Sequence, residues 1–439
     1  LISQANALAT AGTLMPEFKN ASTWATEGTQ GLNESLDTQF NDDGVEYELD
    51  FSYHTAAISD FREIYLIAQA NNKTNLLSPS YISKLKKATE FVMDMIYPNY
   101  TIDNFNDTRS ASYSKSTLLN RLKEYSAMYP DNNELLWVAT EGKNGSKPSY
   151  TTKAYSTSGY YMLRSGWDKD ATMMILKNNY NPTNQWHCQP DNGTFGLYRK
   201  DRNFFPDAGV YAYSGDPARD KYNQSFWHNT MTITTTNINK MEGHYVHKGT
   251  QDNTNYIVTE NEPYENSSLT HRRSVFHANK EFFVLVDELY MKNPEEAYNT
   301  GKYNLNFNLC APENEITFDN SNSKAAHGIH TNYSDNNNIV IYTSSEDYDS
   351  SATFKSNVSN DHGVVNIENR LGYKISLRKN KDRKTIRAIT VIYPTSNPTG
   401  TTINAEFTDG GYTGKAVAIK VTVNGTPYEL SYTIPENNN

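Results

Sequence analysis

The chain has 439 residues, more than one ordinary domain holds, so its length predicts two or three packed units. Its formal net charge of -10 argues against nonspecific nucleic-acid binding, although an acidic protein can carry a locally basic cleft for an acidic substrate. No run of about 18 apolar residues occurs, which predicts no membrane span. The only cysteines, Cys188 and Cys310, allow one disulfide and exclude zinc-finger spacing.

Residues 1–140 predict a helical unit. Leu1, Ala5 and Leu8 share a helical face with no N-cap residue before them, so we expect this helix to continue upstream of Leu1. The segment lacks a basic region followed by an apolar stretch, so it does not resemble a secretory signal. Further apolar stripes at helical spacing occur over 58–68, 81–95 and 118–125.

Two polar segments, 40–54 and 104–112, separate these stripes and carry charged and aromatic residues. Loops of this kind are where a helical scaffold usually places its functional site. Residues 141–154 are predicted to be a linker, because Lys, Gly, Ser and Pro dominate the stretch EGKNGSKPSY and no periodicity is left.

From residue 155 to 435 the pattern changes to short β-branched or aromatic segments separated by turn residues. Many strands in a row without helical spacers imply stacked antiparallel sheets, that is, a large β-sandwich. Helices first and sheets afterwards predict an α+β multidomain chain. The predicted strands are GYYMLRSG, ATMMILKNN, NTMTITTT, RRSVFHA, EFFVLVDEL, KYNLNFNL, NIVIYTS, AITVIYP and AVAIKVTV.

Tyr53 and His54 stand directly before a predicted helix that starts near Ala56. A tyrosine can exchange a proton with a substrate when nearby cations or hydrogen-bond donors lower its pKa. A tyrosine that only packs at a helix start would give the same pattern, so the residues alone leave both roles open.

The segment WHCQPDNGTF, residues 186–195, lies between predicted strands at 171–178 and 194–199. His187 could act there as a general acid, a donor to a carboxylate or a metal ligand. His187 and Gln189 would point together, because alternate residues of an extended segment share a face. A hydrogen-bonded structural loop is the alternative interpretation.

A third group combines Asp207 in FFPDAGVYAY with His228 in FWHNT. An Asp and a His from different strands, joined by a glutamine carbonyl, could bind a divalent metal. The sequence has no short-range metal spacing, so a buried Asp–His hydrogen bond is the competing interpretation.

Several of these segments resemble one family. AGTLMPEFKNAS, DGVEYELDFSYH, NQWHCQPDNGTFGLYRKDRNFFPDAGVYAY, WHNTMTI and RRSVFHANKEFFVLVDE are similar to heparinase II/III-type polysaccharide lyases, above all the heparinase III group of polysaccharide lyase family 12. The resemblance implies the C-terminal half of an incomplete (α/α) toroid followed by a large antiparallel β-sandwich. This agrees with the helix-then-strand pattern.

The resemblance implies a catalytic role for Tyr53 in its YELDFSYH element and for His187 in its WHCQPDNGTF element. Related members bind a structural metal through a His, an Asp and a second His, and the matching positions here are Gln189, Asp207 and His228. Glutamine in place of the first histidine favours a harder ion such as calcium over zinc, or no metal at all.

Four further residues are candidate substrate contacts. Arginine suits this task because it pairs bidentately with carboxylates and sulfates, although a surface or interdomain salt bridge would use it equally well. The candidates are His54, Arg109, Asn192 and Arg202.

Family members also carry an Asn-His pair directly before the segment that matches LISQANALATAG, and the Asn holds the substrate carboxylate. Leu1 follows the place where this pair would stand, so we expect the chain to be a fragment of a longer protein.

The reaction that the resemblance implies is β-elimination at a uronic acid of an acidic polysaccharide, with heparan sulfate as the first choice, in a periplasmic or secreted enzyme. Two alternatives stay open. One is a lyase for another uronate polymer, such as alginate, a glucuronan or an exopolysaccharide. The other is a noncatalytic carbohydrate-binding fragment.

Overall fold

The computed structural model describes residues 2–180, 187–210, 215, 217–233, 242–262, 269–291, 302–319, 326–355, 359–360, 363–364, 370–378 and 385–436. The chain forms two compact units. The first comprises Leu1–Tyr150, Tyr155–Ser158 and Gln185–Cys188, and the second comprises Thr151–Ala154, Gly159–Asn184 and Gln189–Asn439. The main division, after Tyr150, falls inside the segment 141–154 that we predicted to be a linker.

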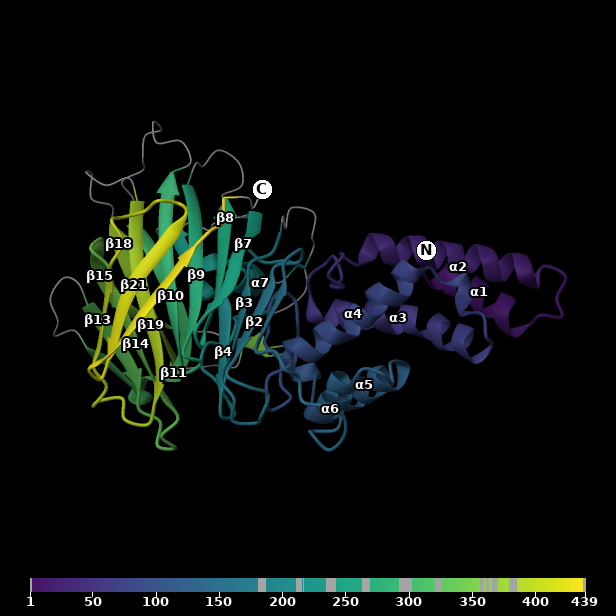
Figure 1. The fold of residues 1–439 in the computed structure, drawn as a ribbon, viewed down its shortest axis with the longest axis horizontal. Helices are drawn as coiled ribbons and strands as arrows, with labels where there is room; N and C mark the ends of the chain where they lie inside the picture. The colour runs from purple at the N-terminus through teal and green to yellow at the C-terminus, as the bar shows by residue number, and fades with distance from the viewer. Residues whose placement is uncertain are drawn as a thin grey trace. The chain divides into compact units, whose positions relative to one another are not determined.

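The described part of the first unit is helical (Figure 1). The three predicted apolar stripes lie on α3, α4 and α5, whose N-termini are capped by the side chains of Asp50, Ser78 and Ser114. The helices are α1 (Ile2–Leu14), α2 (Ala21–Gln39), α3 (Phe51–Ala70), α4 (Pro79–Met95), α5 (Lys115–Met128) and α6 (Asn133–Ala139). Within the described ranges, each helix is too short or too polar to cross a bilayer.

The buried stripe of helix α2 consists mostly of small residues, and these determine how the helix packs. A Cβ added to Gly12 on α1 would lie 2.2 Å from the backbone nitrogen of Ala25 on α2. A Cβ added to Gly28 would lie 2.3 Å from the backbone nitrogen of Ala9. The two helices therefore pack backbone against backbone, and only glycine fits at these two contacts.

The second unit consists mainly of sheets, so the predicted α+β class is confirmed (Figure 1). Neighbouring strands with a described register run antiparallel. The central sheet has the order β12 (Ile316–Asp319), β13 (Ala326–Thr331), β14 (Asn338–Ser344), β19 (Thr385–Thr395), β10 (Phe282–Met291), β9 (Leu269–Ala278), β8 (Thr254–Glu262) and β7 (Glu242–Gln251).

Smaller sheets accompany this central sheet. Every one of the nine predicted strand segments overlaps an observed strand. The short helix α7 (Pro217–Tyr222) is the one α-helix in the described part of this unit. The smaller sheets are β1 (Thr152–Tyr155), β2 (Tyr160–Arg164), β3 (Met173–Lys177), β4 (Phe195–Arg199) and β5 (Arg202–Asn203); β15 (Tyr348–Lys355), β18 (Arg370–Arg378), β11 (Lys302–Pro312) and β6 (Met231–Ile233); β16 (Ser359–Asn360) and β17 (Gly363–Val364); and β20 (Ile403–Phe407), β21 (Ala416–Val423) and β22 (Thr426–Thr433).

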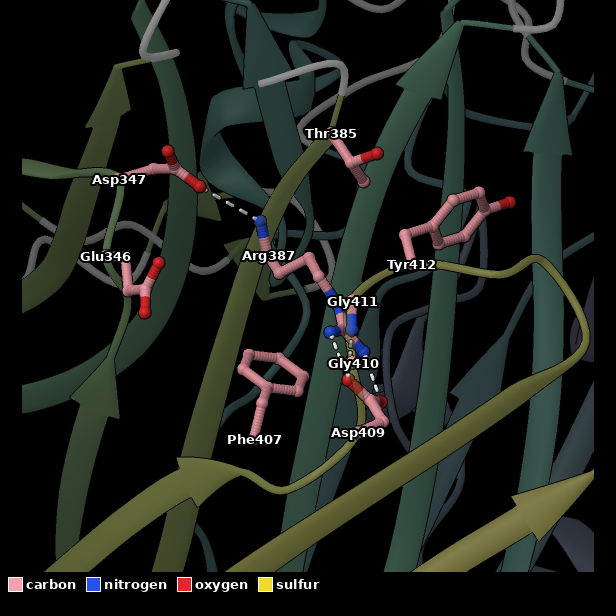
Figure 2. A pocket seen from close by; sticks show the side chains of 9 residues that line it. All are labelled: Glu346, Asp347, Thr385, Arg387, Phe407, Asp409, Gly410, Gly411 and Tyr412. Atoms are coloured by element: carbon pink, nitrogen blue, oxygen red, sulfur yellow. Dashed lines mark hydrogen bonds and ion pairs between the residues drawn. The ribbon is translucent and has the colours of Figure 1, made fainter. Parts of the chain in front are cut away.

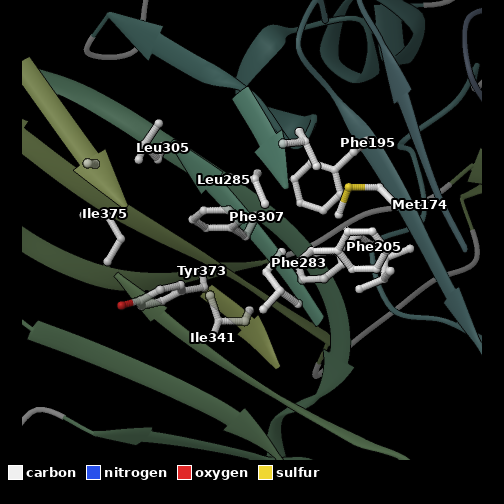
Figure 3. Close-up of a cluster of buried hydrophobic side chains, with 14 of the residues drawn as sticks. Met174, Phe195, Phe205, Phe283, Leu285, Leu305, Phe307, Ile341, Tyr373 and Ile375 are labelled. Carbon is white, nitrogen blue, oxygen red and sulfur yellow. The ribbon is translucent and has the colours of Figure 1, made fainter. Parts of the chain in front are cut away.

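Strand β10 is apolar on both faces because the central sheet is covered on both. Phe283 and Leu285 join a cluster with side chains from β3, β4, β11 and β18 (Figure 3). Val284 and Val286 point the other way and join a second cluster with side chains of β20, β21 and β22. A strand buried on both sides reads as a continuous apolar run, as EFFVLVDEL does. Both cysteines are free thiols, so the disulfide that the composition allowed is not formed.

Candidate functional site

The N-terminus of α3 presents Tyr53. Asp50 is the N-cap residue, and its Oδ1 accepts hydrogen bonds from the backbone N–H groups of Ser52 at 2.8 Å and Tyr53 at 3.0 Å. Leu49 has a left-handed backbone (φ 58°) that turns the preceding loop into the helix. Tyr53 therefore lies on the first turn of a 20-residue helix, and the Asp50 cap holds its backbone in place.

The loop 105–108 is tied to the same helix start. Asn106 has a left-handed backbone (φ 60°), and its Nδ2 donates to the carbonyl of Leu49 at 2.6 Å. Thr108 Oγ1 donates to Asp50 Oδ2 at 2.8 Å and accepts from the backbone N–H of Phe51 at 3.1 Å. Both predicted polar segments, 40–54 and 104–112, therefore meet at one place in the first unit.

His187 joins this place within the first unit. Its ring stacks on Tyr53 with centroids 3.9 Å apart and an interplanar angle of 22°. Its Nδ1 lies 2.9 Å from Asp107 Oδ2, and its Nε2 lies 4.0 Å from Glu48 Oε1. The structure therefore brings together Tyr53 and His187, the two residues that the sequence predicted to be catalytic. It also places beside His187 two carboxylates that the sequence did not predict, those of Asp107 and Glu48.

Carboxylates dominate the electrostatics around these two rings. The hydrogen bond to Asp107 raises the pKa of His187, against the effect of burial, and the charges of Glu48 and Asp50 act in the same direction. Burial and the charge of Glu48 raise the pKa of Glu46 to about 9, and burial raises that of Asp50 to about 6. The surroundings thus favour a charged imidazole at His187 and a protonated carboxyl at Glu46.

His54, a predicted substrate contact, has a different place. The side chain is completely buried, Nδ1 accepts from the backbone N–H of Glu46 at 3.1 Å, and Nε2 lies 2.9 Å from the carbonyl of Ala88. Only the neutral ring with hydrogen on Nε2 satisfies both bonds. Burial accordingly lowers its pKa to about 4. His54 therefore braces the loop against α4 and has no exposed atom to offer a substrate.

The other predicted substrate contacts differ in availability. Asn192 is buried, and its amide exchanges two hydrogen bonds of 2.9 Å with the backbone of Asn179. Arg202 is held by Asp335 at 3.0 Å and lies 3.7 Å from the ring centre of Tyr333. Arg109 is partly exposed and stands two residues after Asp107.

The second unit contains a buried cluster of Asp191, Asp207 and His228 whose potential ligand atoms lie within 4.8 Å of one another. His228 Nδ1 is 2.9 Å from Asp207 Oδ2 and 3.9 Å from Asp191 Oδ2. Gln189 is also buried, and its Nε2 donates to the carbonyl of Gly209 at 3.3 Å. Two carboxylates and an imidazole match the donors of a calcium or zinc site.

Lys177 complicates the charge of this cluster. Its ammonium, fully buried on β3, contacts the carboxylate of Asp191. Burial raises the pKa of Asp191 even so, whereas the neighbouring carboxylates raise that of His228 against the effect of its burial. Sequence reasoning named neither Asp191 nor Lys177, although Asp191 stands within the WHCQPDNGTF segment.

Both parts of the chain match family models. Residues 1–137 match the model described as Heparinase II/III N-terminus, and residues 147–402 match Heparinase II/III-like, C-terminal. The chain belongs to the heparinase II/III-like family. The resemblance read from the motifs around Tyr53 and His187 is therefore confirmed.

Relatives of this heparinase II/III-like chain carry one description. It is 41% identical, over 99% of its length, to a heparin-sulfate lyase of Bacteroides thetaiotaomicron, of which it covers 63%. It is 32% identical, over 88% of its length, to a heparin-sulfate lyase of Pedobacter heparinus, of which it covers 56%. The chain thus spans less than two thirds of the length of these relatives.

Solved structures of the family have the same fold. A structure described as heparinase III has a TM-score of 0.85 and 38% identity, covering 99% of this chain and 67% of that one. A heparan sulfate lyase from Pedobacter heparinus has a TM-score of 0.88 and 28% identity, covering 100% of this chain and 66% of that one.

This heparinase II/III-like chain also has a pocket of about 470 Å³ in its second unit (Figure 2). Arg387 crosses it, with Nη1 and Nη2 bound to Asp409 at 2.6 and 2.8 Å and Nε bound to Glu288 at 2.8 Å. Glu346 and Asp347 add further negative charge to the lining. Because the arginine is already neutralised, the pocket does not suit a polyanion.

Proposed function

We propose that this protein is a polysaccharide lyase that cleaves heparan sulfate by β-elimination at a uronic acid. The observation that carries the proposal is the stacked pair of Tyr53 and His187, with centroids 3.9 Å apart, in two motifs of the heparinase II/III-like family. The heparin-sulfate lyase description of a relative at 41% identity supports heparan sulfate as the first substrate to test.

The chemistry starts at C5 of the uronic acid, whose proton is weakly acidic. Its removal becomes feasible when hydrogen-bond donors stabilise the charge that develops on the adjacent carboxylate. Tyr53 takes the C5 proton, electrons move into a C4–C5 double bond, and the C4–O bond breaks. The leaving oxygen then receives a proton from an acid.

The configuration at C5 of the uronic acid determines which proton transfers Tyr53 and His187 perform. In glucuronate the C5 proton and O4 lie on the same side, so Tyr53 performs both transfers. In iduronate they lie on opposite sides, so Tyr53 and His187 each perform one. Arg109 is the proposed contact for a carboxylate or sulfate, because it is a partly exposed arginine in the loop that carries Asp107.

The test is incubation of the full protein with heparan sulfate, alginate and a glucuronan, in ordinary and in heavy-oxygen water. A lyase yields an unsaturated product that absorbs in the near ultraviolet and contains no heavy oxygen, because no water adds. Unsaturated product from alginate or glucuronan, and none from heparan sulfate, would show that the substrate is another uronate polymer. Saturated, labelled product would refute elimination, and binding without product would support a noncatalytic role.

We also propose that Asp191, Asp207 and His228, with Gln189 beside them, hold one divalent cation, calcium or zinc. Among the described residues, Asp191 Oδ2 and His228 Nε2 are buried without a hydrogen-bond partner. Such atoms are costly in a protein interior unless an ion or another group binds them. A bound cation would neutralise the buried carboxylates and hold their loops together.

Metal analysis of the purified protein tests this cation site. The proposal expects about one equivalent of calcium or zinc per chain and a lower melting temperature after chelation. A protein that contains no metal and is indifferent to chelators would show that Lys177 and His228 alone balance the two carboxylates.

The proposed location is the periplasm or the cell exterior, where a polymer of this size is accessible. Cell fractionation with an antibody to the chain tests this, and recovery in the cytoplasmic fraction alone would contradict it.

A further inference from the structure

We infer that Asp107 is the positioning residue for His187: it holds Nδ1 and leaves Nε2 as the ring nitrogen that acts on the substrate. The inference rests on the proposed lyase function for the reaction itself, but the geometry it describes is independent of the substrate. Sequence analysis named His187 without a partner, because 80 positions separate it from Asp107.

The support behind Asp107 is rigid and buried. The carboxylate side chain is 1% exposed and lies 2.9 Å from His187 Nδ1. The residues on either side are both anchored to the start of α3, Asn106 through the carbonyl of Leu49 and Thr108 through Asp50. A carboxylate held from both sides can fix the direction of the imidazole as well as its contact.

The His187 ring is restrained in two further ways. Tyr53 covers one face of the ring in a nearly parallel stack, which limits rotation about the side-chain bonds. The next residue, Cys188, donates its thiol to the carbonyl of Glu48 at 3.5 Å and accepts from Asn106 Nδ2 at 3.8 Å. The backbone at His187 is therefore tied to the same two loops that carry Tyr53 and Asp107.

The chemistry of the contact sets the tautomer. An ionised carboxylate has no proton to donate, so the hydrogen between Asp107 and His187 stays on Nδ1. Nε2 is then the nitrogen free to accept a proton or to pass one on. Glu48 is the described carboxylate that faces Nε2, at 4.0 Å, beyond direct hydrogen-bond distance. His187 can therefore reach a substrate through Nε2 while its other end remains anchored.

The direct test is nitrogen NMR of the full protein with labelled histidine rings, with the His187 signals assigned by their loss in His187→Gln. In spectra recorded above the pKa of His187, where the ring is neutral, we expect the hydrogen on Nδ1 in the wild type. Asp107→Asn, whose amide can donate to Nδ1, should give a mixed or reversed tautomer. Asp103→Asn is the matched control, because Asp103 is a buried carboxylate of the same segment that binds Tyr97 at 2.7 Å instead. A neutral wild-type ring with its hydrogen on Nε2 overturns the inference.

The kinetic test follows the lyase reaction on an iduronate-containing substrate. We expect kcat to fall about 100-fold or more in Asp107→Asn and Asp107→Ala, with KM changed less than about threefold. Asp103→Asn should keep near wild-type kcat. Wild-type kcat in Asp107→Ala, or a loss confined to KM, overturns the inference.

The NMR and kinetic tests distinguish a failure of the proposed lyase function from a failure of the role inferred for Asp107. If the wild type makes no unsaturated product from any polymer, the proposed function fails, while the NMR result still decides the role of Asp107. If an Asp107 variant does not fold, the tautomer of the wild type gives the answer without it.

Discussion

Replacing Arg273 by methionine should destabilise the second unit through a defined set of lost contacts. Arg273 lies on β9 and is completely buried. Its Nε binds Asp287 on β10 at 2.7 Å, and its Nη1 donates to the carbonyls of Gly193 and Asn229. The arginine therefore ties the central sheet to the two segments that carry Asp191 and His228.

The size of the effect follows from what Arg273→Met leaves behind. Asp287 loses its cationic partner but keeps its hydrogen bond with His271 Nε2 at 2.7 Å, so the cost lies at the lower end of the about 3–5 kcal/mol expected for an unpaired buried carboxylate. Each carbonyl that loses its donor costs about 1–3 kcal/mol, and these losses overlap rather than add fully. A total of about 5 kcal/mol lowers the melting temperature of a unit of this size by about 10 °C.

Calorimetry of wild type and variant measures this shift. The matched control is Arg202→Met, whose ion pair with Asp335 has side chains 26% and 53% exposed and should contribute less than about 1 kcal/mol. Arg273→Met combined with Asp287→Leu should recover part of the loss, because no buried charge is left unpaired. The recovery is partial because buried His271 Nε2 loses its acceptor, Asp287, in the double variant. A drop no larger than that of Arg202→Met would refute the reasoning.

Three further predictions concern titration and the cation. The pKa of buried Glu46 is raised to about 9, so the protonated Glu46 side chain stabilises the fold at acid pH, and this contribution is lost as the pH rises toward about 9. Glu46→Gln should therefore raise the melting temperature, measured by circular dichroism, in mildly alkaline buffer and not in acid. The pKa of buried His54 is lowered to about 4, whereas the pKa of histidine in the unfolded chain is about 6.5. The free energy of unfolding should therefore fall by roughly 3 kcal/mol as the pH drops from about 6.5 to about 4. In denaturant titrations, the free energy of unfolding of His54→Gln should depend less on pH over this range. Asp207→Asn should abolish the effect of chelators on the melting temperature, and an unchanged chelator response would remove Asp207 from the cation site.

Periodicity identified the elements that bury strong apolar patterns. Helices α3, α4 and α5 and the central-sheet strands β9, β10, β14 and β19 were predictable for this reason. Strand β10, for example, places Phe283 and Val284 into two different cores. Helix α2 was not predicted, because its buried stripe consists mostly of small residues such as Ala25 and Gly28, which give a weak apolar signal. Strand β7 was missed because only one residue of the strand, Gly243, is buried, so no alternation of apolar residues marks it.

The candidate site was predictable in part. Tyr53 and His187 stood out in motifs, whereas their carboxylate partners did not. Asp107 lies in a polar loop where an aspartate is ordinary, and only the folded backbone brings it 2.9 Å from His187. His54 looked like a substrate contact because it follows Tyr53, yet the helical rotation between neighbouring residues turns it into the core, where both of its nitrogens are bound.

The central claim is that Tyr53 and His187 carry out β-elimination on heparan sulfate. Its most direct test is the rate at which unsaturated uronate forms from heparan sulfate in the wild type and in Tyr53→Phe. Tyr100→Phe serves as a matched control, because its hydroxyl binds the carbonyl of Val138 at 2.7 Å in the same unit. The account predicts product from the wild type and the control, and almost none from Tyr53→Phe with the fold intact. Near-normal turnover in Tyr53→Phe would contradict it.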